Sequence, residues 1–164
     1  MPRPIIALLT DFGGADHYVG AMKGVILGIC PDATLVDITH EVAPHDVLGG
    51  SLELAACHEA FPPRTVFLVV VDPGVGSARR GVGAVSGPYT FVAPDNGILT
   101  AVLRRRRPSR AVELTEQEYA RTPISRTFVF HTGPVSIWLS IYSRRKPSKM
   151  GSSQSTIVNS GGHF

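Results

Sequence analysis

Short apolar runs alternate along this chain with longer segments in which apolar residues recur at helical spacing. Five runs are short enough to be strands, and they lie at residues 5–9, 35–38, 66–71, 81–85 and 89–92. Three segments have the apolar spacing of amphipathic helices, at residues 18–29, 46–60 and 98–105. Strands that alternate with helices predict an α/β layered fold with a largely parallel central sheet flanked by helices.

The run at residues 66–71 is the most informative of these segments. It contains six apolar residues and stops abruptly at Asp72 and a proline turn, which is typical of a strand buried on both faces. Open α/β sheets bind ligands beyond the carboxyl ends of such strands. Gly74 and Gly76 permit turns that other residues resist, and Arg79 can then fold back toward the acid. The pattern predicts an Asp72–Arg79 pair suited to catalysis.

Acidic loops follow three of the predicted strands, at Asp11, Asp72 and residues 95–96. The carboxyl ends of parallel strands share one edge of a sheet, so these loops are expected to converge. Structural interpretations stand beside this one. Asp11 could be the N-cap of the following helix, and Asp72 could belong only to a tight turn. Residues 95–97 are expected to form a turn and a helix start rather than to bind a ligand directly.

Composition points to a single core with a modest positive charge. With 164 residues, 43% of them hydrophobic, the chain is most simply one globular domain. The formal net charge is +3, and four arginines in a row at residues 104–107 contribute to it. Such a run suits a nucleic-acid contact, but it also suits the solvated C-terminus of a helix, which is the preferred interpretation here.

The cysteines and histidines outside these loops suggest structural roles. Cys30 and Cys57 lack a CxxC spacing and are expected to be buried free thiols of a cytoplasmic protein. His40 and His45 are expected to be hydrogen-bonded structural residues. The chain shows no signal peptide and no apolar stretch near the ~18 residues needed to cross a bilayer, so no membrane partner is expected.

The composition changes near residue 130. No Asp or Glu follows Glu118, and residues 136–160 are rich in serine and basic residues. Such segments bury little surface and tend to be disordered, although residues 135–142 could form one strand or helical turn. The sequence therefore predicts an α/β domain over residues 1–130 and a divergent basic, Ser-rich tail over residues 131–164.

Six short motifs occur in a fixed order, and together they resemble the S-adenosyl-L-methionine (SAM) hydroxide adenosyltransferase family, the relatives of the fluorinase and chlorinase enzymes. The resemblance runs over residues 5–128, about three quarters of the chain. The motifs lie at residues 10–13, 18–24, 37–42, 71–77, 93–100 and 125–128. Each motif alone is weak, but the ordered set is highly specific.

The resemblance implies hydrolysis of SAM to adenosine and L-methionine, with water or hydroxide attacking the ribose 5′ carbon. It implies catalytic roles for Asp72 and Arg79, and a role for Asp11 in holding the ribose diol. Asp72 and Phe128 are also implied as substrate contacts. Halogenating members carry an aromatic residue at the position of Asp72, so this residue favours hydrolysis. No metal or cofactor is expected, because the sulfonium is already a good leaving group.

Two departures from the family pattern concern the end of the chain. The family's catalytic histidine directly follows a Thr-Phe pair, whereas His131 lies two positions farther on and is the only candidate. The family's second domain, a small β-barrel, helps to form the adenine pocket of a neighbouring subunit in a homotrimer, and nothing after His131 resembles it. A frameshift or truncation near codon 129 explains both departures. An intact barrel in another reading frame of the gene would support this hypothesis, and its absence would contradict it.

Three functional hypotheses follow. The chain is a SAM hydrolase of this family, here in a truncated and weakly active form. Alternatively, it is an inactive module that keeps the α/β core and binds adenosine-like ligands weakly or not at all. The third and least favoured hypothesis is a nucleic-acid-binding protein that uses the basic segments, although aromatic residues are not interleaved with them.

Overall fold

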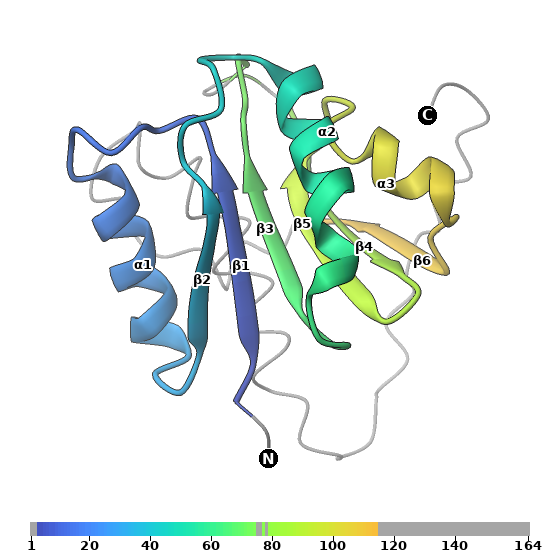
Figure 1. The fold of residues 1–164 in the computed structure, drawn as a ribbon, viewed down its shortest axis with the longest axis horizontal. Coiled ribbons are helices and arrows are strands. Elements are labelled where there is room, and N and C mark those ends of the chain that lie inside the picture. The colour runs from blue at the N-terminus through green and yellow to red at the C-terminus, as the bar shows by residue number, and fades with distance from the viewer. Residues whose placement is uncertain (1–2, 75–76, 78, 115–164) are drawn as a thin grey trace.

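A computed structural model describes residues 3–74, 77 and 79–114 of the chain (Figure 1). Its centre is a six-stranded sheet with the order β2-β1-β3-β5-β4-β6. The strands are β1 (Ile5–Thr10), β2 (Thr34–Thr39), β3 (Val66–Val70), β4 (Gly81–Ser86), β5 (Tyr89–Pro94) and β6 (Arg110–Glu113).

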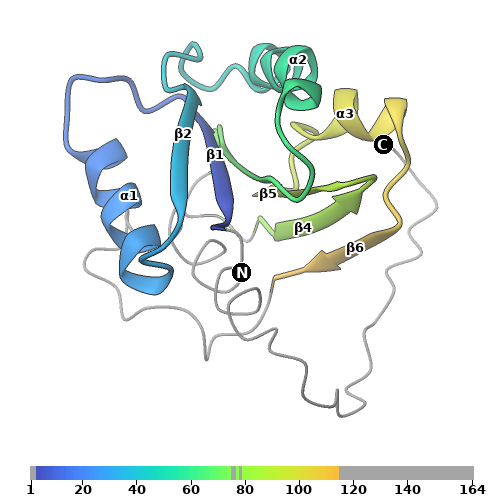
Figure 2. The same ribbon diagram turned by 60° about the horizontal axis from the view of Figure 1, so that its bottom comes forward.

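The sheet is largely parallel, as predicted. Strands β2, β1, β3 and β5 run in the same direction, and β4 is antiparallel to both β5 and β6. Strand β6 was not predicted. It has only four residues, most of them exposed, at the edge of the sheet beyond β4 (Figure 2). Its conformation depends on pairing with β4, which the local sequence does not reveal.

Helices cover both faces of the sheet. They are α1 (Tyr18–Ile29), α2 (Val47–Cys57), which continues into a 3₁₀ turn at His58–Ala60, and α3 (Thr100–Arg105). Helix α2 begins after Asp46, whose side chain accepts a hydrogen bond from Gly49 N at 2.8 Å. Within the described part of the chain, no helix is long and apolar enough to cross a membrane.

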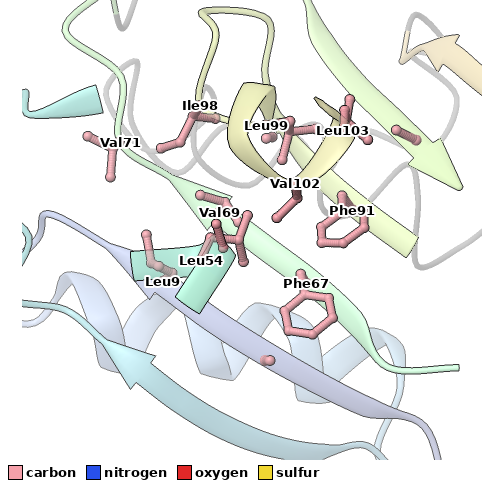
Figure 3. Packing of buried hydrophobic residues seen from close by; sticks show 14 of the residues in the cluster. Leu9, Leu54, Phe67, Val69, Val71, Phe91, Ile98, Leu99, Val102 and Leu103 are labelled. Atoms are coloured by element: carbon pink, nitrogen blue, oxygen red, sulfur yellow. The ribbon is translucent and has the colours of Figure 1, made fainter. Parts of the chain in front are cut away.

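Strand β3 lies between two hydrophobic clusters and contributes side chains to both. Phe67, Val69 and the residue after the strand, Val71, pack with α2 and α3 (Figure 3), and the alternate side chains pack with Met22 and Ile26 of α1. All five residues of the strand are buried. The prediction that this strand is covered on both faces is therefore confirmed.

Replacing Phe67 with alanine should destabilise the fold strongly. The ring is fully buried and stacks on Phe91 with a centroid separation of 5.1 Å. Removal of such a ring leaves a cavity, and we expect a loss of about 3–5 kcal/mol of unfolding free energy, measured by urea denaturation. Leu48→Ala is the matched control, because Leu48 is 71% exposed and its loss should change stability by less than about 0.5 kcal/mol. A loss below about 1 kcal/mol for Phe67→Ala would contradict this account of the core.

Arginines of the basic run make contacts within the fold. Arg105 ends α3 and donates from Nη1 to the carbonyl oxygen of Ala55 in the last turn of α2, at 2.8 Å. The carbonyl oxygen of Arg106 accepts a hydrogen bond from Ser86 at 2.7 Å. These contacts agree with the interpretation of the run as a helix terminus.

Both cysteines are free thiols, as predicted, but they are half-buried rather than buried. Burial is the main cause that raises the pKa of each thiol. The thiols are therefore expected to react slowly near neutral pH.

Candidate active site

The three acidic loops meet at one edge of the sheet. Strands β1 and β3 are adjacent and parallel, with Thr10 opposite Val70, so Asp11 and Asp72 follow neighbouring strand ends. The main-chain N–H of Asp11 donates to the carbonyl oxygen of Val70 at 3.4 Å. Strand β5 is the next parallel neighbour of β3, and Asp95 follows its last residue. The convergence expected from the sequence is therefore present.

Asp72 and Arg79 form a close ion pair at this edge. Arg79 Nε lies 2.8 Å from Asp72 Oδ1, and the side chain of Asp72 is only 7% exposed. The N–H direction is poorly aligned for a hydrogen bond, so the contact acts mainly through charge. Asp72 Oδ1 also accepts a hydrogen bond from Gly74 N at 2.8 Å. The turn thus holds the carboxylate through a cation and a main-chain donor.

Gly74 is required for a reason that the sequence analysis did not anticipate. Its φ angle does not lie in the left-handed region, so the expected conformational freedom is not used there. A Cβ atom at this position would instead lie 2.8 Å from Arg79 Nε and even closer to Nη2. The glycine therefore leaves room for the guanidinium to reach Asp72.

The loop after β5 supports both members of this pair. Asn96 Nδ2 donates to the carbonyl oxygen of Val71 at 2.8 Å, and its Oδ1 accepts from Ile98 N at 3.1 Å. The predicted turn and helix start are therefore confirmed, although α3 begins two residues later than expected. The carbonyl oxygen of Asp95 lies 3.5 Å from Arg79 Nη1, and the Asp95 carboxylate pairs with Arg80.

Asp11 is held by the loop that follows β2. Its Oδ2 accepts a hydrogen bond from the main-chain N–H of His45 at 2.9 Å, and His45 has a φ of 66°. Asp11 is not the N-cap of the next helix, because His17 occupies that position and α1 starts at Tyr18. Residues 12–17, which include Gly13 and Gly14, separate Asp11 from the start of the helix. The carboxylate is therefore left at the strand end.

His40 is hydrogen-bonded, as predicted from the sequence, but the polar chain beside Asp11 to which it belongs was not predicted. Thr10 is fully buried, and its Oγ1 lies 2.8 Å from His40 Nδ1. His40 Nε2 lies 3.1 Å from Asp37 Oδ1, and Asp37 Oδ2 accepts a hydrogen bond from Lys23 Nζ at 2.6 Å. The signal that could have revealed this chain is a histidine directly after a strand that neighbours β1.

Asp37 is kept ionised by its partners. Burial by itself raises the pKa of this carboxyl group, but the hydrogen bond and the charge of Lys23, together with the nearby His40 ring, outweigh burial and lower the pKa below its usual range. The side chain remains 43% exposed, so the associated stabilisation is modest.

Two predicted site residues, His131 and Phe128, lie outside the described residues. Residues 3–74, 77 and 79–114 contain no group of three or more His, Cys, Asp or Glu side chains arranged to hold a metal ion.

The sequence pattern of the SAM hydroxide adenosyltransferase N-terminal domain matches residues 6–146. The chain belongs to this family. An (R)-S-adenosyl-L-methionine hydrolase of Salinispora tropica is 42% identical over 130 residues, which are 77% of this chain and 49% of the relative. A fluorinase of Nocardia brasiliensis is 34% identical over 139 residues, which are 71% of this chain and 46% of that enzyme.

A solved structure is similar to this chain in both fold and sequence. It is an uncharacterized conserved protein from Thermotoga maritima, with a TM-score of 0.76 and 42% identity, and the match covers 83% of this chain and 53% of that one. The chain spans about half the length of the curated relatives it matches.

Proposed function

We propose that this chain carries the reactive half of a site that hydrolyses SAM to adenosine and L-methionine. The observation that supports this most is the Asp72–Arg79 pair at the strand edge, with an Nε–Oδ1 distance of 2.8 Å, beside the loop that holds Asp11. Family membership and the name of the 42%-identical relative point to the same reaction.

The proposed reaction is a displacement at the ribose 5′ carbon. The oxygen of a water molecule forms a bond to this carbon while the bond from carbon to the sulfonium sulfur breaks. The electron pair of the broken bond moves to sulfur, which leaves as the neutral thioether of methionine. Asp72 orients the water and accepts its proton, and the positive charge of Arg79 favours developing hydroxide. In the proposal, His131 is the third group that holds the water.

Substrate binding would use the other carboxylate at the same edge. Asp11 has two oxygens that can accept hydrogen bonds from both hydroxyls of the ribose. Its Oδ2 already accepts one from His45 N at 2.9 Å, which fixes the orientation of the group. Carboxylates also favour a substrate that is a sulfonium cation. Phe128 is proposed as a further substrate contact.

The proposal includes the assembly expected from the resemblance. In intact family members, a homotrimer would let the β-barrel domain of a neighbouring subunit complete the adenine pocket. Residues 1–130 would form the α/β domain, with residues 131–164 as the divergent basic tail. We propose a cytoplasmic location, which is consistent with the two free thiols. We also propose that the protein needs no cofactor. Its proposed partner is a small-molecule substrate rather than a nucleic acid.

The experiment that tests the function is chromatographic detection of adenosine after incubation with SAM. Calorimetry with SAM and with adenosine separates the alternatives. Release of adenosine supports the hydrolase. Binding without release supports the inactive adenosine-binding module, and the absence of both binding and release would contradict the hydrolase.

Gly74→Ala should reduce turnover without unfolding the protein. The new methyl group would displace the Arg79 guanidinium, whose flexible end can move at little cost to stability. A displacement of about 1 Å can cost on the order of a hundredfold, so we expect kcat to fall by about ten- to a hundredfold. Gly24→Ala on α1 is the control, because a Cβ there meets nothing within 4 Å. Unchanged kcat in Gly74→Ala would mean that the close approach of Arg79 is unimportant.

A further inference from the structure

His40 contacts the β1 loop on both sides of Asp11. Its ring Nδ1 lies 2.8 Å from Thr10 Oγ1, just before Asp11, and its carbonyl oxygen accepts a hydrogen bond from Gly13 N at 2.7 Å, just after it. The loop that follows β2 contains His40 and also His45, whose main-chain N–H donates to Asp11 Oδ2 at 2.9 Å. Asp11 is therefore surrounded by contacts from the loop that follows β2.

We propose that His40 is a positioning residue that fixes the Asp11 carboxylate through the hydroxyl of Thr10. Its benefit for ribose binding rests on the function proposed above. The positioning itself depends only on contacts within this chain, so the two can be tested separately.

The Thr10 hydroxyl transmits the position of His40 to the Asp11 turn. Thr10 Oγ1 accepts a hydrogen bond from Phe12 N at 3.2 Å, which closes a short turn with Asp11 at its apex. The hydroxyl proton is then free to be donated to His40 Nδ1. Because Thr10 is fully buried, no water can replace a lost partner at low cost. His40 therefore fixes the rotamer of Thr10, and with it the turn.

The far side of the imidazole is fixed by charge. His40 Nε2 lies 3.1 Å from Asp37 Oδ1, with an alignment too poor for a full hydrogen bond. An ionised carboxylate at this distance favours the tautomer with the proton on Nε2, which leaves Nδ1 as the acceptor for Thr10. Lys23 of α1 holds Asp37 in place at 2.6 Å. The ring is thus supported from a second strand and a helix.

Substitution of His40 by asparagine or by glutamine tests the contacts of the two ring nitrogens separately. Asparagine places a polar atom near the position of Nδ1, whereas glutamine places one near Nε2. His40→Asn should therefore keep the contact with Thr10, and His40→Gln should lose it. His17→Gln is the control, because His17 is exposed and lies outside this polar chain.

Amide hydrogen exchange, measured by NMR on the full chain, is the deciding readout. We expect the Phe12 and His45 amides of His40→Gln to exchange at least about tenfold faster than in the wild type, whereas His40→Asn stays within about threefold. Urea unfolding of each variant shows whether the change is local. The proposal would be overturned if the amides of His40→Gln exchanged at the wild-type rate. It would also be overturned if both variants showed the same increase in exchange rate.

Ligand preference then tests the link to ribose binding. Calorimetry compares adenosine with 2′,3′-dideoxyadenosine, which lacks both hydroxyls. We expect the wild type and His40→Asn to prefer adenosine, and His40→Gln to lose about tenfold of that preference. If the wild type shows no preference, the diol role of Asp11 is wrong, while the exchange rates still decide whether His40 positions the turn.

Discussion

Asp72→Asn should lower the rate of SAM hydrolysis at least about a thousandfold. Asparagine keeps the shape of the side chain and an oxygen that can accept from Gly74 N, so the turn should persist. It removes the negative charge that orients the water, accepts its proton and pairs with Arg79 at 2.8 Å. Loss of a positioned general base typically costs about a hundred- to ten-thousandfold. The measurement is the rate of adenosine release, with the substitution made in the most active form available.

The control for this substitution is Asp32→Asn, which removes the same charge from an exposed turn away from the site. Its rate should match that of the wild type. Thermal unfolding of Asp72→Asn should show that the fold is retained. A rate for Asp72→Asn within about threefold of the wild type corresponds to less than about 1 kcal/mol of barrier, and it would mean that Asp72 is not the key carboxylate.

The 164-residue chain alone should be a poor catalyst compared with the same α/β domain joined to the remaining half of a full-length relative. The chain spans about half of those relatives, and the family histidine is displaced to His131. Adenine contacts would supply binding energy that positions the ribose carbon, and the histidine would help to orient the water. Without the adenine contacts and the histidine in its family position, kcat/KM should be lower by at least about a hundredfold. The measurement is the adenosine released at low SAM concentration.

The comparison needs a control in which the appended domain is present but cannot restore chemistry. A joined protein that carries Asp72→Asn serves this purpose, because it keeps the binding surface and lacks the reactive carboxylate. If the chain alone turns over SAM as fast as the joined protein, His131 or another residue already completes the site.

The features of the fold that follow from local patterns could be predicted. A continuous apolar run identified β3, and acids directly after three strands identified the edge where Asp11, Asp72 and Asp95 meet. The return of Arg79 to Asp72 was also predictable, because the turn between them is short. In each case the decisive residues are neighbours in sequence or follow from parallel strand order.

Features that depend on tertiary contacts could not be predicted. Strand β6 exists because β4 offers it a partner. Gly74 is needed because Arg79 passes over it, rather than for its own backbone angle. The contact between Thr10 and His40 joins residues 30 positions apart, and it depends on β1 and β2 being neighbours in the sheet. The roles of His131 and Phe128 stay predictions.

The central claim is that water attacks the ribose 5′ carbon at a site built around Asp72. Reaction in water enriched in oxygen-18, followed by mass spectrometry of both products, tests it most directly. We expect adenosine that is two mass units heavier, unlabelled methionine, and loss of both products in Asp72→Asn. Unlabelled adenosine, or label in methionine, would contradict the proposed reaction.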